Sequence, residues 1–115
     1  MLRDQEYLLD ILEAANLAVR YVAGVSQDVY LQDTQLQDSV IRRLEIIGEA
    51  VRRISSETQA KYPSIPWREM IGMRNRMIHS YDDIDLYLVW QTVQHDLPRL
   101  IAIIDPLFPL DESGV

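Results

Sequence analysis

The sequence of 115 residues has no cysteine, a single phenylalanine and only one lysine. Without cysteine, the chain can form neither a disulfide framework nor a thiolate metal site. No apolar run approaches the roughly 20 residues that cross a bilayer, and the N-terminal sequence MLRDQEYLLD has charges where a signal peptide has its apolar run. We therefore expect a soluble cytoplasmic protein, of a length that suits one domain with one core.

An overall excess of positive charge is also absent, because the net charge is −7. Residues 1–41 hold two basic and seven acidic side chains, which gives a net charge of −5. Residues 42–76 hold eight basic and four acidic side chains (+4), and residues 77–115 hold one basic and seven acidic side chains (−6). Ten of the eleven basic residues are arginine, whose forked guanidinium suits phosphate. The basic middle segment could therefore meet an anionic partner. Alternatively, four of its arginines form only a solvated helix face: Arg42, Arg43, Arg52 and Arg53.

Apolar side chains recur every three or four residues along almost the whole chain, which predicts helices and no strand. A first helix should end near Gly24, since glycine commonly terminates helices. Ser26 could cap a short helical turn after it, and Asp33 or Thr34 should begin the longest helix. That helix has an apolar seam that suits antiparallel packing in a bundle, formed by Leu36, Val40, Leu44, Ile47, Val51 and Ile54.

Two prolines in the sequence KYPSIPW interrupt the helical pattern. Pro66 fits the first turn of a next helix, which we expect to run from Trp67 to about Ser80. A last helix follows the aspartates after it, and Pro98 should kink that helix because proline removes a backbone hydrogen bond. We predict an all-α fold, a four- to five-helix up-and-down bundle, in a single domain over residues 1–108 with a frayed tail at 109–115.

Arg74 is placed where its helix should be apolar. At about 100° per residue it falls between Met70 and Ile71, in the middle of a stripe that we expect to face the core. A guanidinium keeps its proton, and burying it unpaired costs several kcal/mol. Arg74 therefore needs either an internal carboxylate, for which Glu45 and Glu49 are the natural candidates, or a cleft in which it meets an anion.

His79 is expected in the final turn of the same helix, where the helix dipole favours a protonated imidazole. In a structural interpretation, Arg74 pairs with a glutamate, His79 completes the helix end, and one of three aspartates caps the next helix: Asp82, Asp83 or Asp85. The aspartates could alternatively bind Mg²⁺, but capping is the simpler explanation. His95 lies on a polar helix face without a readable catalytic partner, and we treat it as structural.

A functional interpretation gives the arginine and the histidine a joint task. Arginine binds a phosphodiester and stabilises the additional negative charge of a five-coordinate phosphorus. Histidine can take a proton from a ribose 2′-hydroxyl, or give one to the leaving 5′-oxygen, near neutral pH. No metal is needed, because the 2′-oxygen of RNA is the nucleophile. One histidine cannot readily serve as both base and acid, whereas two chains related by a two-fold axis supply two.

The run RNRMIHSY, from Arg74 to Tyr81, resembles the R-x4-H-x-Y signature of the HepT toxins, members of the all-helical HEPN superfamily. The similarity extends over most of the chain through RRLEIIGEAVRRIS, YPSIPWREMIGMRNRMIH and VWQTVQHDLPRLI. This resemblance implies a HEPN-like homodimer whose two R-x4-H motifs meet in one cleft. It also implies a metal-independent endoribonuclease without a cofactor, which is the toxin of a type VII-like toxin–antitoxin pair and cuts an RNA such as tRNA or mRNA.

The resemblance also implies roles for individual residues. Arg74 and His79 would be catalytic, Asn75 would shape the cleft, and we assign Glu49 to the cleft as well. Tyr81 would accept AMP from the antitoxin partner, an MntA-like minimal nucleotidyltransferase, and the modification would silence the toxin.

Two neighbours of the tyrosine depart from the family's common pattern. Ser80 and Asp82 stand where many relatives have a glycine and an aromatic residue, and the additional acid beside the cleft would weaken phosphate binding. Some HEPN domains only bind nucleotides. The alternative function is therefore a non-catalytic, nucleotide-binding helical dimer that serves a nucleotidyltransferase partner, and a purely structural helical protein is a third possibility. RNA cleavage in EDTA by the purified protein distinguishes the first function from the other two.

Overall fold

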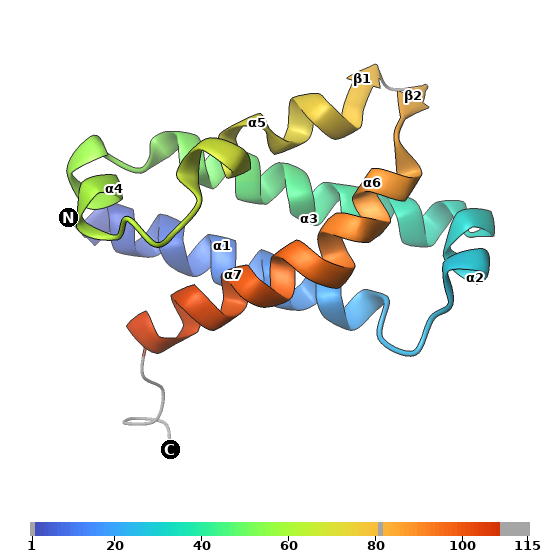
Figure 1. Cartoon of the computed structure of the whole chain (residues 1–115), viewed down its shortest axis with the longest axis horizontal. Helices are drawn as coiled ribbons and strands as arrows, with labels where there is room; N and C mark the ends of the chain where they lie inside the picture. Colours follow the sequence, from blue (N-terminus) through green and yellow to red (C-terminus); the bar gives the residue numbers. More distant parts are fainter. Residues whose placement is uncertain (1, 81, 109–115) are drawn as a thin grey trace.

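Four long helical segments run in alternating directions through the computed structural model, which describes residues 2–80 and 82–108 (Figure 1). Three are single helices: α1 (Leu2–Tyr21), α3 (Thr34–Arg53) and α5 (Trp67–Met77). The fourth is a rod in which α6 (Leu86–Gln91) continues into α7 (Leu97–Ile104). Two short helices join the first three segments: α2 (Gln27–Gln32) and α4 (Ser56–Lys61). The predicted all-α fold is confirmed apart from one short hairpin. The predicted tail at 109–115 lies outside the described residues, as do residues 1 and 81.

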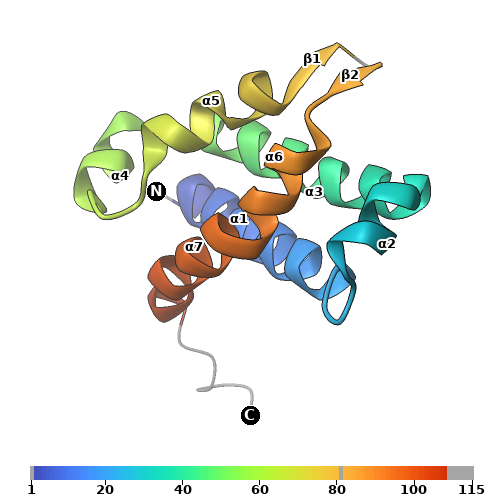
Figure 2. The same ribbon diagram turned by 45° about the vertical axis from the view of Figure 1, so that its right-hand side comes forward.

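The core forms where α1 lies along α3, with α7 crossing α1 and α5 resting on α3 (Figures 1 and 2). The predicted seam of α3 faces inward, and five of its six residues are buried: Val40, Leu44, Ile47, Val51 and, directly after the helix, Ile54. On α1, the small side chains of Ala15 and Ala18 are fully buried beside Ile11, which lets the two helices approach closely. Among the described helices, none combines the length and the apolar character that crossing a bilayer requires.

Short polar side chains fix where the helices begin. The Ser26 hydroxyl accepts a hydrogen bond from the backbone N–H of Val29, and the Asp33 carboxylate accepts one from Leu36, as predicted for the starts of α2 and α3. Gly24, with φ of +75°, makes the turn after α1 in a backbone conformation that other residues avoid.

Helix α4 has no counterpart in the prediction, because none of its residues is buried and its sequence SETQAK has no apolar periodicity. A buried carboxylate holds it in place. Asp4 of α1 is only 5% exposed and accepts hydrogen bonds from the hydroxyls of Ser55 and Thr58, each at 2.6 Å. These bonds lower the pKa of Asp4.

The expectation of no strand is wrong at one place, because β1 (Ile78–Ser80) and β2 (Asp83–Ile84) pair as an antiparallel hairpin that projects from the helices (Figures 1 and 2). Helix α5 consequently ends at Met77 rather than near Ser80. Ile78 already has extended backbone angles, with φ of −118° and ψ of 101°, and pairs with Ile84. Two β-branched residues in register favour such a pairing over another helical turn.

The predicted disruption at Pro98 takes the form of a π-helical turn, η1 (Thr92–Asp96), between α6 and α7. Here the N–H of Leu97 donates to the carbonyl oxygen of Thr92, five residues earlier. Because proline has no N–H and its ring crowds the carbonyl one turn back, the helix widens just before it. After α7, a 3-10 turn, η2 (Asp105–Leu107), ends the described chain.

Candidate active site

Arg74 lies on the surface of α5, where it forms an ion pair with α3. Its Nε is 3.7 Å from Oε2 of Glu45, and the two side chains are 45% and 29% exposed. The other carboxylate oxygen of Glu45 is 3.9 Å from a guanidinium nitrogen of Arg42. One carboxylate is therefore shared between two guanidinium groups, so the trio carries a positive charge in excess. In the described part of the chain, Glu45 is the only ion-pair partner of Arg74.

The buried face of α5 is shifted from the one that the sequence suggested, although Trp67 and Met70 are buried as predicted. Its buried side chains are Trp67, Met70, Met73 and Met77. Ile71, which we expected on this face, is 37% exposed. The inner face therefore extends toward Met73, which is 5% exposed. Arg74 therefore lies at the edge of the apolar face rather than in its middle, which explains how it can be both paired and exposed.

His79 is the central residue of β1, and it is exposed. The expectation that it lies in the last turn of α5 is wrong, since the helix ends two residues earlier. Its neighbour Ile78 is buried at 9% exposure. Because successive side chains of a strand point to opposite faces, His79 is directed away from the core. The hairpin lies just beyond the helix that carries Arg74 (Figure 2), and His79 on it is exposed to solvent.

The structure brings some of the other predicted site residues near this pair. Asn75 is exposed on α5, directly after Arg74. Glu49 is exposed on α3, but Glu45, one turn earlier, makes the ion pair. Helices α3 and α5 run antiparallel (Figure 1), so a residue late in α5 lies beside the middle of α3. This direction, which the sequence does not display, decides that Glu45 rather than Glu49 pairs with Arg74. Tyr81 lies outside the described residues.

The aspartates of the hairpin have local structural roles. Asp85 accepts a hydrogen bond from the backbone N–H of Leu88 at 3.0 Å, which confirms that one of the three aspartates caps the next helix. Asp82 accepts a bond of 2.7 Å from the hydroxyl of Ser80. Residues 2–80 and 82–108 contain no group of three histidine, aspartate or glutamate side chains placed to hold a metal ion. His95 is exposed in η1.

The basic segment is only in part a solvated face. Arg42, Arg52 and Arg53 are exposed on α3, whereas Arg43 is half-buried and its Nε has no hydrogen-bond partner in the described part of the chain. Because α3 contacts α5, the two helices that hold most of this positive charge are neighbours, and Arg74 belongs to one of them.

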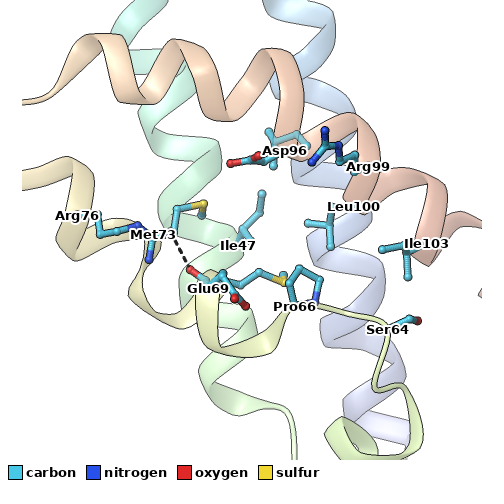
Figure 3. Close-up of a pocket in the computed structure, with 12 residues that line it drawn as sticks. Ile47, Ser64, Pro66, Glu69, Met73, Arg76, Asp96, Arg99, Leu100 and Ile103 are labelled. Atoms are coloured by element: carbon cyan, nitrogen blue, oxygen red, sulfur yellow. Dashed lines mark hydrogen bonds between the residues drawn. The ribbon is translucent and has the colours of Figure 1, made fainter.

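A separate pocket of about 370 Å³ lies between α3, α5 and α7 (Figure 3). Ile47, Met73 and Leu100 contribute to its apolar wall, and Arg76 beside it donates a hydrogen bond of 3.1 Å to the carbonyl oxygen of Glu69 (Figure 3). Arg76 is about 200° around the helix from Arg74, and neither Arg74 nor His79 lines the pocket. Arg74 and His79 are exposed and lie outside this pocket.

Four antiparallel helical segments, with an exposed arginine on the third and an exposed histidine five residues later, define an all-helical domain of the HEPN type. The sequence model of the family described as Ribonuclease HepT-like matches residues 11–107. The chain therefore belongs to the HepT-like ribonuclease family, as its motif suggested.

Named relatives agree with this family. The chain is 40% identical over 94 residues to a Methanocaldococcus jannaschii protein named "Putative RNase MJ1380". The alignment covers 82% of this chain and 86% of the relative. The chain is also 42% identical over 96 residues to a Thermococcus cleftensis protein named "Probable ribonuclease HepT", and this alignment covers 84% of this chain and 87% of the relative. A Caldanaerobacter subterraneus protein named "Putative RNase TTE0752" is 35% identical over 94 residues, which are 82% of this chain and 84% of the relative. No solved structure matches the chain.

Proposed function

We propose that the chain is a metal-independent endoribonuclease in which Arg74 and His79 are the catalytic residues. The observation that carries this proposal is the exposure of both side chains on consecutive elements, α5 and β1, within the span that the ribonuclease family matches. Glu45 orients the guanidinium from one side, and Arg42 compensates the charge of that glutamate. Arg74 thereby keeps the electrostatic strength that an RNA phosphate requires.

In the proposed reaction, His79 removes the proton from a ribose 2′-hydroxyl while the 2′-oxygen attacks the adjacent phosphorus. Arg74 stabilises the additional negative charge of the five-coordinate phosphorus. The bond from phosphorus to the 5′-oxygen then breaks, and the leaving oxygen takes a proton from a second imidazole. The products are a 2′,3′-cyclic phosphate and a 5′-hydroxyl, so all atoms and protons are accounted for without a metal ion.

The second imidazole would come from the partner subunit's His79 in a homodimer whose two motifs share one cleft. A two-fold axis places the same surface patch of both chains face to face, and the two open surfaces would together enclose the RNA. Scattering or analytical centrifugation should give a dimer, and RNA affinity should fall as salt rises because phosphate contacts release counterions. A monomer, or RNA binding that is insensitive to salt, would contradict the composite site.

We also propose that the protein is the toxin of a toxin–antitoxin pair, with a nucleotidyltransferase partner that transfers AMP to Tyr81. The phenol oxygen would attack the α-phosphorus of ATP, and pyrophosphate would leave. Tyr81 is two residues from His79 in the sequence, so an added phosphate and adenosine would compete with RNA for Arg74 and hinder access to the imidazole. Support for this step comes from the motif alone.

The test of the ribonuclease proposal is cleavage of labelled RNA by the purified protein in EDTA, with the product ends mapped. Cyclic phosphate and 5′-hydroxyl ends are expected, and the activity should disappear in both Arg74→Ala and His79→Ala. Binding of RNA or nucleotides by the wild type without any cleavage would instead favour a non-catalytic, nucleotide-binding dimer.

A further inference from the structure

The hairpin that carries His79 is tied to the helices at its base. The backbone N–H of Asp85 donates a hydrogen bond of 2.8 Å to the carbonyl oxygen of Met77, the last residue of α5. Ile78 and Ile84 form the first pair above this bond, and His79 is the next residue along β1. The position of the imidazole therefore depends on how firmly Asp85 is held.

Asp85 joins the hairpin base to the first turn of α6. While its N–H bonds to Met77, its carboxylate accepts the N–H of Leu88 at 3.0 Å and caps the helix. The next residue, Leu86, offers its carbonyl oxygen to the hydroxyl of Tyr30 at 2.9 Å. The start of α6 is thus fixed from two sides, by its own cap and by a side chain from α2.

Tyr30 connects this turn to α3. The residue is 0% exposed, its ring centroid lies 4.9 Å from that of Trp90, and its carbonyl oxygen accepts a bond of 2.9 Å from the side-chain amide of Gln37. Burial, with a smaller contribution from the negative charge of Asp85, raises the pKa of Tyr30 to about 12. The hydroxyl therefore remains a donor toward Leu86 at any pH at which the protein is handled.

Helix α3 consequently supports both halves of the candidate site. Its Glu45 holds Arg74 directly, and its Gln37 holds Tyr30, which holds the α6 turn at the hairpin base. The two contacts are eight residues apart, or about 12 Å along the helix at 1.5 Å per residue. Helix α3 is thus in contact with both parts of the candidate site, with Arg74 directly and with the hairpin base through Tyr30.

We propose that Tyr30 and Asp85 are positioning residues that hold His79 in register with Arg74 for RNA cleavage. The proposal rests on the ribonuclease function proposed above. Tyr30 is fully buried, so its hydroxyl cannot contact RNA and acts only through geometry. A displacement of about 1 Å in a catalytic group can reduce the rate by roughly 10²-fold, whereas RNA affinity depends on surface cations that these residues do not provide.

The experiment compares Tyr30→Phe, which removes one oxygen, with two controls. Tyr87→Phe makes the same change in α6 at a side chain that is 61% exposed, and Ile11→Val removes one methyl group from the core, where Ile11 is 0% exposed. We expect the kcat of Tyr30→Phe to fall about 10-fold or more, with KM within about two-fold of the wild type. Tyr87→Phe and Ile11→Val should keep the wild-type kcat, although Ile11→Val also lowers the melting temperature.

A second pair of variants tests Asp85. Asparagine is a good helix cap and alanine is not, so Asp85→Asn should retain most of the kcat that Asp85→Ala loses. If Tyr30→Phe cleaves RNA like the wild type, or if Ile11→Val loses as much kcat at equal loss of stability, the positioning role is refuted. Equal losses in Asp85→Asn and Asp85→Ala would also refute it.

Hydrogen exchange separates a failure of this proposal from a failure of the ribonuclease assignment. Tyr30→Phe should accelerate exchange of the Asp85 amide, which bonds to Met77, relative to Tyr87→Phe. If the wild type cleaves no RNA, the ribonuclease function is wrong. Accelerated exchange would still show that Tyr30 stabilises the base of the hairpin. If the exchange rate of the Asp85 amide is unchanged in Tyr30→Phe, Tyr30 does not stabilise the hairpin base, whether or not RNA is cut.

Discussion

Replacing Arg74 by alanine separates a structural ion pair from a catalytic group, because the two roles predict different energies. The charged atoms of Arg74 and Glu45 are 3.7 Å apart on side chains that are 45% and 29% exposed. At this separation the attraction is about 1 kcal/mol in water, and exposed pairs typically contribute about 0.2–1 kcal/mol. Arg74→Ala should therefore lower the free energy of unfolding by no more than about 1 kcal/mol and leave a folded helical protein.

The expected loss of activity is much larger. Removing one preorganised donor to the charge of a transition state typically reduces kcat by about 10²–10³-fold, or about 3–4 kcal/mol. Stability is measured by chemical denaturation at one fixed protein concentration, with fluorescence of the two tryptophans, Trp67 and Trp90, as the signal. Cleavage is measured on labelled RNA in EDTA.

Glu45→Gln is the matched control, since it removes the same ion pair but keeps the guanidinium. We expect a similar loss of stability, with cleavage retained to within about 10-fold because Arg74 loses an orienting partner and not its charge. The catalytic role of Arg74 would be refuted if Arg74→Ala lost more than about 2 kcal/mol of stability and Glu45→Gln abolished cleavage as completely. Arg74 would then serve mainly to join α5 to α3.

Three further predictions concern single side chains. His79→Ala should remain folded and lose roughly 10²–10⁴-fold in cleavage rate, whereas His95→Ala should cut RNA normally; equal losses would remove the special role of His79. Tyr81→Phe should cut RNA but resist silencing by the nucleotidyltransferase and ATP, and intact mass spectrometry should show AMP-sized additions on the wild type alone. The pKa of Asp4 is lowered from 3.8, so its stabilising effect is full above that pH and is lost as pH falls through the folded-state value. The melting temperature of Asp4→Asn should thus differ most from the wild type near neutral pH and converge with it in acid, unlike that of the exposed Asp10→Asn.

The helical frame was predictable because it depends on local chemistry that the sequence displays. The seam from Val40 to Val51 has the period of one helix face and is buried. Ser26, Asp33 and Asp85 cap helices where short polar residues precede apolar periodicity. Helix α4 escaped prediction because its stability comes from Asp4, more than fifty residues away in the sequence, and no local pattern reports such a contact.

The hairpin could not be predicted for a related reason. Ile78 lies four residues after Arg74, so its spacing continues the helical period, and strands of three and two residues are too short to show alternation. The deciding interactions join residues six and eight positions apart, beyond the reach of one helical turn: the pairing of Ile78 with Ile84 and the bond between Asp85 and Met77. Local propensity alone therefore extends α5 too far.

That error bears on the proposed function, because the contacts that end α5 also place His79 on a strand rather than on the helix. In a continued helix, His79 would be about 140° around the axis from Arg74, and the two side chains could not readily meet one phosphate. In the observed hairpin, His79 lies beyond the end of the helix, and the contacts of Asp85 and Tyr30 that we propose to position it lie at the base of the hairpin and at the start of α6. In the proposed site the R-x4-H spacing therefore spans the end of α5, and the contacts that end this helix would contribute to the site together with the arginine and the histidine.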